Sequence, residues 1–385
     1  MTPSADFVAY LRQVFVLMRK ELRQVVRDRV LFGFTVYLFS LHIVITTLGA
    51  SDDLRRATTL VYDGDRSAES REFERRLRAP YFVVEGDVRN ENDGMTALDR
   101  GNARVFVDVP GDFSERLERF DQQAHVQMLV DTSKASLGYL ASSYASRIAE
   151  GFGEDIAAGR LARAGITEPP PRIENRERTW FNFALDMRLA FSLQTMVLMT
   201  SVACVLLPAT AAVREKERGT IEQLLVSPLS PLQIMLAKVG AMVLVTLAGT
   251  AVALYAVLEP LFHLVLRGSA PLFFAMVALY AFALSGLGLA LSTLARSSAQ
   301  AGLLVTLTVL PMIFLSGTAT PVEGMPALMQ WGVRALPLSH FLHITYGIVF
   351  RGEGLATLWP SVAAVVAIGT LFFALGLWRF RKQLA

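Results

Sequence analysis

The hydrophobic residues of this chain are gathered into long blocks instead of recurring with the period of an amphipathic helix or strand. About 20 apolar residues in a helix cross the ~30 Å hydrocarbon core of a bilayer. Six blocks reach roughly that length and predict transmembrane helices: residues 30–49, 189–213, 232–258, 271–295, 299–316 and 355–378. The fifth block is the shortest, and Pro311 within it predicts a kink or an irregular end.

The segment before the first block, residues 1–29, is predicted to form a basic amphipathic helix over 7–29. Its apolar positions recur at helical spacing: Phe7, Leu11, Val14, Phe15, Met18, Leu22, Val25 and Val26. Its charge comes from Arg12, Arg19, Lys20, Arg23, Arg27 and Arg29. Such a helix favours the membrane interface with its apolar face toward the lipid. A plain cytoplasmic helical extension is the alternative.

Residues 50–187, between the first two blocks, have the length of one soluble domain. Strands are predicted at 57–65, 81–87, 103–110 and 125–131, and helices at 67–79, near 94–101, and at 134–165. Alternating strands and helices favour a small α/β or α+β domain. Residues 317–354, which are half apolar and broken by three prolines, predict short re-entrant or interfacial helices within the 188–385 core.

Charge predicts the orientation of the spans. Residues 50–187 hold 19 Lys/Arg and 25 Asp/Glu, whereas the rest of the chain holds 18 and 9. The basic residues flank the apolar blocks, so the positive-inside rule explains them better than nucleic-acid binding does. This rule places both termini in the cytoplasm and residues 50–187 outside it. The chain has one cysteine and no recognisable cleavable signal peptide, so no disulfide within the chain is expected.

One short stretch breaks the apolar pattern, "VREKERGTIEQLLVSPLSP" at 213–231. Five consecutive charges, residues 214–218, separate two spans. Beyond them, Thr220 and Gln223 have the spacing of a capping box. Ser227-Pro228 ends the predicted two-turn helix, and Ser230-Pro231 is expected to begin the next one. A helix this short needs a docking partner, which is either another protein or the chain's own span ends.

The segment "REKERGTIEQLLVSPLSPLQIMLAK" resembles the cytoplasmic coupling segment of ABC-2 type transporter permeases. Residues 314–352 are similar to the outer re-entrant segment of that family, although Leu336 stands where asparagine is expected before Pro337. The stretches "VYDGDRSAESREF" and "VDVPGDFSERL" look like the large extracytoplasmic insertion of its drug-export-like subgroup. Together these likenesses extend over nearly the whole chain.

The resemblance implies a polytopic α-helical permease with six spans and one extracytoplasmic domain, in the inner membrane of a bacterium. It further implies a non-catalytic subunit that works with a second permease copy or a paralogue. ATP and Mg²⁺ would belong to a separate ATPase subunit, so no cofactor is expected on this chain. The coupling segment, 214–230, would contact that subunit through Arg214, Glu215, Glu217, Arg218, Gly219, Thr220, Glu222 and Leu225.

Within the coupling segment, Glu217 and Glu222 are the expected polar contacts and Leu225 the apolar anchor. No G-x-x-x-x-G-K-[ST] loop is present. The fragment "LSGLG" at 284–288 lies within a span, where its small residues favour close helix packing. The transport path is predicted along the second and fifth spans, near Met196, Met199, Met312 and Phe314, although a packing role suits them equally.

Two other classes of function stay open from the residues alone. An ion-driven transporter usually has ionisable groups at mid-membrane, and here His42 is the one candidate, with Lys238 expected to reach the membrane surface. A sensor or adaptor would use residues 50–187 as its working part. His340 and His343 are expected to be polar anchors rather than metal ligands. The cargo, and any periplasmic adaptor, cannot be read from these features.

Overall fold

The computed structural model describes residues 3–49, 57–77, 82–119, 122–131, 135–163, 187–219, 229–318 and 322–384. The chain forms two compact units, which are described separately. The sheet unit comprises Asp52–Glu177. The helical unit comprises Met1–Ser51 together with Arg178–Ala385.

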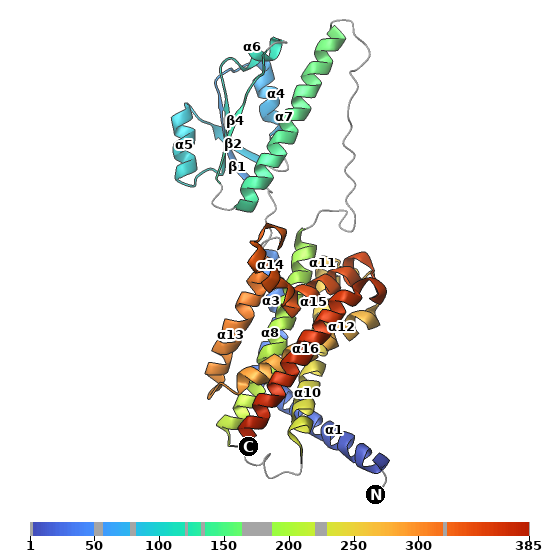
Figure 1. Cartoon of the computed structure of the whole chain (residues 1–385). Helices are drawn as coiled ribbons and strands as arrows, with labels where there is room; N and C mark the ends of the chain where they lie inside the picture. The colour runs from blue at the N-terminus through green and yellow to red at the C-terminus, as the bar shows by residue number, and fades with distance from the viewer. Residues whose placement is uncertain are drawn as a thin grey trace. The chain divides into compact units, whose positions relative to one another are not determined.

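The sheet unit is built on a four-stranded sheet with the order β2-β1-β3-β4 (Figure 1). Its strands are β1 (Ala57–Asp63), β2 (Phe82–Asp87), β3 (Val105–Val109) and β4 (Gln127–Val130). Strand β1 is parallel to both β2 and β3, and β4 is antiparallel to β3. Its helices are α4 (Ala68–Arg76), α5 (Glu91–Asp99), α6 (Phe113–Glu118) and α7 (Ala135–Arg163). The predicted mixed α/β character of this segment is confirmed, whereas the short helix α6 was not predicted.

Successive side chains of a strand point to opposite faces of the sheet, and helices cover both faces. Phe73 of α4, Phe113 of α6 and Phe152 of α7 pack together on one face, with ring centroids 5.5–6.2 Å apart. Phe106 in β3 points to the opposite face, where it lies so close to Gly94 of α5 that no Cβ fits there. In Figure 1, α5 lies on one side of the sheet and α4 and α7 on the other.

The helical unit contains, among the described residues, six helices long and apolar enough to cross a membrane. They are Arg29–Gly49, Arg188–Glu217, Pro231–Phe262, Ala270–Ser292, Ser298–Leu315 and Leu355–Lys382. All six predicted spans are therefore matched. The first is divided at Ser40 into α2 (Arg29–Phe39) and α3 (Leu41–Gly49).

The remaining helices of this unit have the following bounds. The helices are α1 (Pro3–Arg27), α8 (Met187–Glu217), α10 (Pro231–Val252), α11 (Glu259–Phe262), α12 (Ala270–Ser292), α13 (Ser298–Leu315), α14 (Ala327–Arg334), α15 (Pro337–Tyr346) and α16 (Leu355–Leu384). Single π-helical turns cover Ala253–Leu258 and Gly347–Arg351, and a 3₁₀ turn covers Val322–Gly324. Short helices thus occupy the predicted 317–354 segment, whose position on the outer side stays a prediction. Helix α13 continues through Pro311 and ends four residues later.

Small residues set the packing of the central helices α8 and α12. A Cβ built on Gly286 of α12 would lie 2.8 Å from the backbone N and Cα of Phe373 in α16. Gly288, two residues along, faces the Val205 carbonyl oxygen of α8 with no room for a Cβ. The expectation that small residues allow close helix approach at 284–288 is confirmed.

Helix α8 contains a proline, Pro208, which has no N–H to donate to the carbonyl oxygen of Cys204. The Ser285 hydroxyl of α12 donates to that oxygen at 3.3 Å instead. A side chain of the neighbouring helix therefore satisfies the backbone acceptor that the proline leaves open, as bilayer-spanning helices require.

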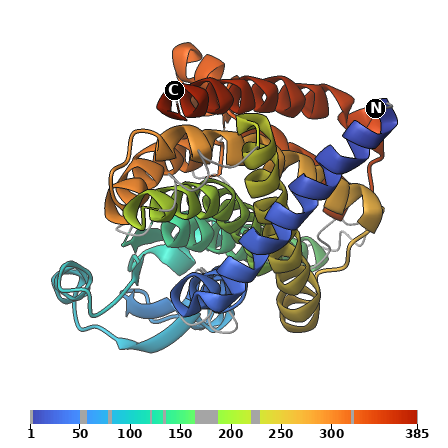
Figure 2. The same ribbon diagram turned by 90° about the horizontal axis from the view of Figure 1, so that it is seen from below.

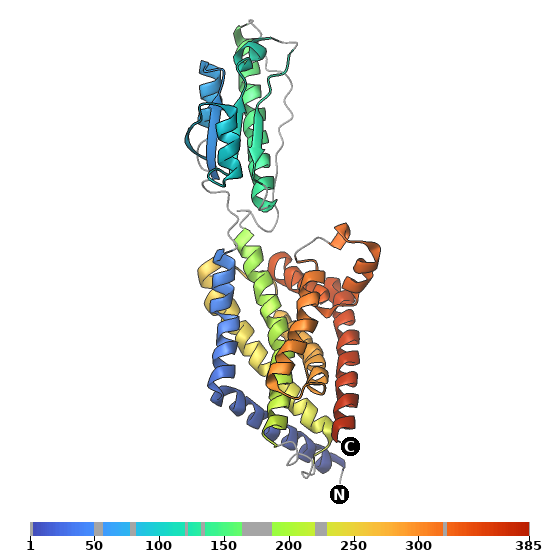
Figure 3. The same ribbon diagram turned by 90° about the vertical axis from the view of Figure 1, so that its left-hand side faces the viewer.

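Helix α1 lies across one end of the helical unit, as the views in Figures 2 and 3 show. It packs along the beginning of α10, where Gln233 donates to Gln13 at 2.8 Å and Met18 lies against Gly240. The last turn of α8 and the C-terminus of α16 lie at this same end (Figures 1 and 3). A helix is therefore present where one was predicted over 7–29, although it ends at Arg27 and its inner face is covered by protein. Its place in the membrane interface stays a prediction.

Candidate functional site

The five charges at 214–218 occupy the last turn of α8 and the residue after it. Helix α8 ends at Glu217, and Gly219 has a φ of +67°, a left-handed conformation that glycine adopts without strain. Successive residues of a helix point about 100° apart. The charges therefore reach different neighbours, and we call this set of contacts the charged junction.

The innermost contact of the charged junction is a buried ion cluster. Lys238 Nζ of α10 lies 2.7 Å from Glu215 Oε2 and 3.1 Å from Glu21 Oε1 of α1. Lys20 Nζ lies 2.9 Å from Glu215 Oε1 and 3.2 Å from Glu21 Oε1. The Lys238, Glu21 and Glu215 side chains are 1–5% exposed, whereas Lys20 is half exposed. Two cations and two anions thus balance where α1, α8 and α10 meet.

This cluster corrects the prediction for Lys238. Instead of extending to the membrane surface, its ammonium group is enclosed by protein and bound by two carboxylates. A buried charge requires a partner, and Glu21 and Glu215 supply two. Burial lowers the pKa of Lys20, but the adjacent Glu21 and Glu215 outweigh that effect and raise it above its ordinary value. Lys20 therefore stays positive throughout the neutral range.

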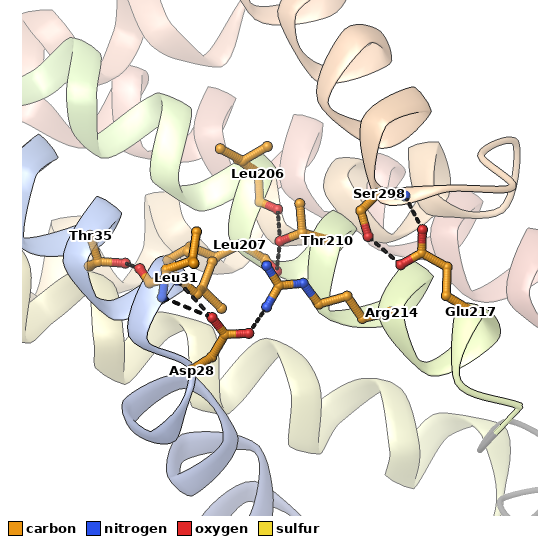
Figure 4. A network of polar contacts seen from close by, with 10 residues as sticks. Asp28, Leu31, Thr35, Leu206, Leu207, Thr210, Arg214, Glu217 and Ser298 are labelled. Carbon is orange, nitrogen blue, oxygen red and sulfur yellow. Dashed lines mark hydrogen bonds and ion pairs between the residues drawn. The ribbon is translucent and has the colours of Figure 1, made fainter.

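Arg214 connects α8 to the turn between α1 and α2. Figure 4 shows its guanidinium group directed at Asp28, with which it forms an ion pair. The same carboxylate accepts from Val30 N at 3.1 Å and Leu31 N at 3.0 Å, which makes Asp28 the N-cap of α2. The bond from Leu31 N, aided by Arg214, lowers the pKa of Asp28.

Removing the Asp28 carboxylate is expected to destabilise the start of α2. Asp28→Ala loses the N-cap and leaves Arg214 without its acid, which we expect to cost about 1–2 kcal/mol of unfolding free energy. Asp28→Asn keeps a capping oxygen and loses only the charge, so it should retain about half of that stability. The thermal midpoint of the purified protein in mild detergent measures both. Equal losses in the two variants would contradict the assignment of Asp28 as a cap.

The other two side chains of the junction reach the connection between α12 and α13. Lys216 Nζ donates to the Ser292 carbonyl oxygen at 2.6 Å, at the C-terminal end of α12. Glu217 accepts from Ser298 N at 2.7 Å and from its hydroxyl at 2.6 Å, at the N-terminus of α13 (Figure 4). A cation at a helix C-terminus and an anion at an N-terminus both suit the helix dipoles.

The proposed coupling helix itself lies outside the described residues. Thr220, Glu222 and Leu225 belong to 220–228, so their predicted roles stay predictions. The residues on either side are described. Gly219 ends the turn after α8, and the Ser230 hydroxyl accepts from Gln233 N while Ser230 N donates to the Gln233 side chain. The helix start predicted at Ser230-Pro231 is therefore confirmed, with a complete capping box.

The four residues predicted along the transport path differ in their surroundings. Met196 and Met312 are buried in the core of the helical unit, and Met199 packs against it. Phe314 is 60% exposed. Packing accounts for the three methionines in the single chain, and a role in transport stays a prediction.

The histidines have partners of their own. His340 Nε2 is 2.9 Å from the Arg334 carbonyl oxygen, and His343 Nδ1 is 3.2 Å from the Ser361 hydroxyl. His42 Nδ1 is 3.4 Å from the Tyr37 hydroxyl. Among the described residues, no group of three or more His, Cys, Asp or Glu side chains could hold a metal ion.

The residues that were not assigned to the junction from the sequence are Lys20, Glu21, Asp28 and Lys238, although Lys238 is the last residue of the motif at 214–238. Two of them carry a signal in the sequence. Glu21 interrupts the apolar face of α1, three residues after Met18 and four before Val25, and Lys238 is the seventh residue of the apolar block 232–258. Opposite charges at two such unfavourable positions favour pairing with each other.

Residues 30–378, which include the charges at 214–218 and nearly all of the six candidate spans, match the sequence profile of the ABC-2 family transporter proteins. The chain belongs to this family. The ABC-2 relatives are similar from end to end. "Inner membrane transport permease YhhJ" of Escherichia coli (strain K12) is 32% identical over 375 residues, 97% of this chain and 98% of the relative. "Probable multidrug ABC transporter permease YbhR" of the same strain is 27% identical over 380 residues, 96% and 99%.

A third ABC-2 relative from this strain, "Probable multidrug ABC transporter permease YbhS", is 25% identical over 377 residues, 97% of this chain and 98% of the relative. The family to which the resemblance pointed is therefore confirmed. These relatives are ABC transporter permeases, which supports a permease role for this ABC-2 chain and a place in the membrane.

Proposed function

We propose that this chain is the permease subunit of an ATP-driven exporter whose ATP is hydrolysed by a separate subunit. The family and the permease relatives support this role. In this proposal the end of the helical unit that carries the charged junction faces the cytoplasm, together with both termini. The sheet unit is extracytoplasmic. A second permease copy or a paralogue completes the transport path, and ATP and Mg²⁺ bind to the ATPase.

The charged junction is the observation that carries this proposal. It ties the last turn of α8 to α1 through Lys20, to α10 through Lys238, and to α13 through Ser298. It lies directly before residues 220–228, the predicted contact with the ATPase. A force applied to that segment would be passed from α8 to α1, α10 and α13 together, because buried ion pairs and packed backbones deform less under force than mobile loops do.

The transport role can be tested through the two predicted acidic contacts. A Glu217→Arg, Glu222→Arg double variant is expected to lose the ATPase from detergent-solubilised complexes, because two carboxylates become two cations at the predicted interface. The measurement is ATP hydrolysis by whatever co-purifies with the tagged permease. An ATP-hydrolysing subunit should co-purify with the wild-type permease. The double variant should lose at least about 90% of the co-purifying ATP hydrolysis.

Two further variants make this result specific. Glu259→Arg reverses an exposed charge at the other end of the helical unit and should leave co-purification unchanged. Glu217→Gln keeps an oxygen that can accept from Ser298 and removes only the charge. Loss of the ATPase in this variant would therefore come from the lost contact with the partner and not from loss of the α13 cap. If no nucleotide-hydrolysing subunit accompanies folded wild type, the transmission role of the junction is wrong.

A further inference from the structure

An open pocket of about 490 Å³ lies beside the charged junction, between α1 and the end of α8. Its lining is almost entirely polar and mostly basic: Lys20, Arg23, Gln24, Arg27, Asp28 and Arg218. We call it the basic pocket. It shares Lys20 with the ion cluster described above and Arg218 with the predicted ATPase contacts, whereas Arg23, Gln24 and Arg27 belong to neither.

The positive charge of the basic pocket is not cancelled locally. Four lining cations and one carboxylate give a formal charge of +3. The Asp28 carboxylate is already bound by Arg214 and by two backbone N–H groups. Behind the pocket, Glu21 and Glu215 carry two negative charges and Lys238 and Arg214 two positive ones, so these four add nothing to the sum, although Lys20 itself is paired with Glu21 and Glu215. A concave surface with this charge concentrates anions.

Three guanidinium groups of the basic pocket are available for a ligand. Within the residues that the structure describes, no hydrogen bond or ion pair engages the side chain of Arg23, Arg27 or Arg218. Arg23 and Arg27 are one helical turn apart on α1, and Arg218 comes from the other wall. Glu217 adjoins Arg218 in the sequence, but its carboxylate is held by Ser298. Guanidinium groups converging from two helices suit the paired oxygens of a phosphate.

The other flank of α1 indicates where that phosphate comes from. Val8, Leu11, Phe15 and Val26 are 51–63% exposed and recur along a single side of this helix, whereas a fifth exposed apolar residue, Val16, lies one turn before Lys20 on the basic side. Between this apolar row and the basic pocket lie Arg12 and Arg19, both exposed. A helix with one apolar exposed flank and one basic flank lies in the membrane interface, at the depth of the lipid headgroups.

We propose that the basic pocket binds the phosphate of an anionic phospholipid headgroup from the leaflet in which α1 lies. The apolar row would contact the acyl chains beside it, and Arg23, Arg27 and Arg218 would hold the phosphate. Lys20 and Asp28 line the pocket and also belong to the charged junction. Bound lipid would therefore strengthen the attachment of α1 to α8 and α10 and make that attachment depend on membrane composition.

The test uses the full-length protein in mild detergent, titrated with phosphatidylglycerol or with phosphatidylcholine of the same acyl chains. Native mass spectrometry counts the lipids retained by each chain, and the thermal midpoint reports their effect on stability. Arg23→Gln with Arg27→Gln should weaken binding of the first phosphatidylglycerol at least tenfold, since each basic residue near a membrane surface contributes roughly fivefold. Binding of phosphatidylcholine should not change.

The matched control is Arg12→Gln with Arg19→Gln, which removes the same charge from the same helix outside the basic pocket. It should leave the first phosphatidylglycerol in place. Arg218→Gln removes a pocket residue from the turn after α8 and should weaken binding roughly fivefold, even where the double variant folds poorly. Circular dichroism and gel filtration verify folding in every variant.

Three results would overturn the proposal. Equal losses in the two double variants would show a diffuse attraction of α1 for anionic lipid and no site. Equal stabilisation by free glycerol phosphate would assign the basic pocket to a soluble anion. Retained lipid with loss of the co-purifying ATPase in Arg23→Gln, Arg27→Gln would assign it to an acidic protein surface.

Discussion

Gly286→Leu is expected to unfold the helical unit at a markedly lower temperature than wild type. At this position even a Cβ would lie 2.8 Å from the backbone N and Cα of Phe373 and 3.0 Å from the carbonyl carbon of Phe372. These are backbone atoms of α16, so no side chain can rotate away, and α12 and α16 must separate. Overpacking of this kind costs about 3 kcal/mol or more at a site that cannot relax.

The measurement is the thermal midpoint in mild detergent, followed by circular dichroism at the helical minimum. Gly302→Leu in α13 is the matched control, because nothing lies within 4 Å of a Cβ built on Gly302. Leucine is also the better helix former, by up to about 1 kcal/mol, so this variant should be neutral or slightly more stable. Equal losses in the two variants would show that α12 and α16 do not meet at Gly286 as described.

Sequence alone located the spans because the requirement that defines them is local. A helix that crosses a bilayer needs about 20 apolar residues in succession, and that count can be made without knowing any neighbour. The same local reasoning identified small residues at Gly286 and Gly288. Local reasoning could not identify Phe373 and Val205 as the residues whose backbone these glycines approach, because those contacts depend on how helices distant in sequence are arranged.

The charged junction illustrates the limit of such reasoning. The run at 214–218 was recognisable, but Lys238 and Glu21, which are 217 residues apart in the chain, were not paired in advance. A lone lysine near the end of a span was expected to reach the surface, since its long side chain allows that. Two buried carboxylates from different helices favoured the interior instead. Helix α6 was missed for a different reason, because six residues are too few to show a helical period.

The second large effect is expected at the centre of the charged junction. Lys238→Met leaves Glu21 and Glu215 buried, with only the half-exposed Lys20 to balance them. Removing one partner from a buried ion cluster typically costs about 3–5 kcal/mol, because the remaining charges cannot recover their hydration. The thermal midpoint should fall accordingly. Lys20→Met removes the half-exposed member of the same cluster and should cost less than Lys238→Met, because water can reach the position that its ammonium group leaves.

A triple variant separates the stability of the cluster from its role in transport. Lys238→Met with Glu21→Leu and Glu215→Leu replaces buried charges by apolar groups of similar volume, which is often neutral or stabilising. We expect the midpoint to recover at least to the wild-type value. If the ion cluster transmits motion from the ATPase, the triple variant should remain folded with its ATPase bound while substrate-stimulated ATP hydrolysis is lost. If substrate still stimulates ATP hydrolysis fully in this variant, the cluster serves only to attach α1, since apolar packing alone would then transmit the force.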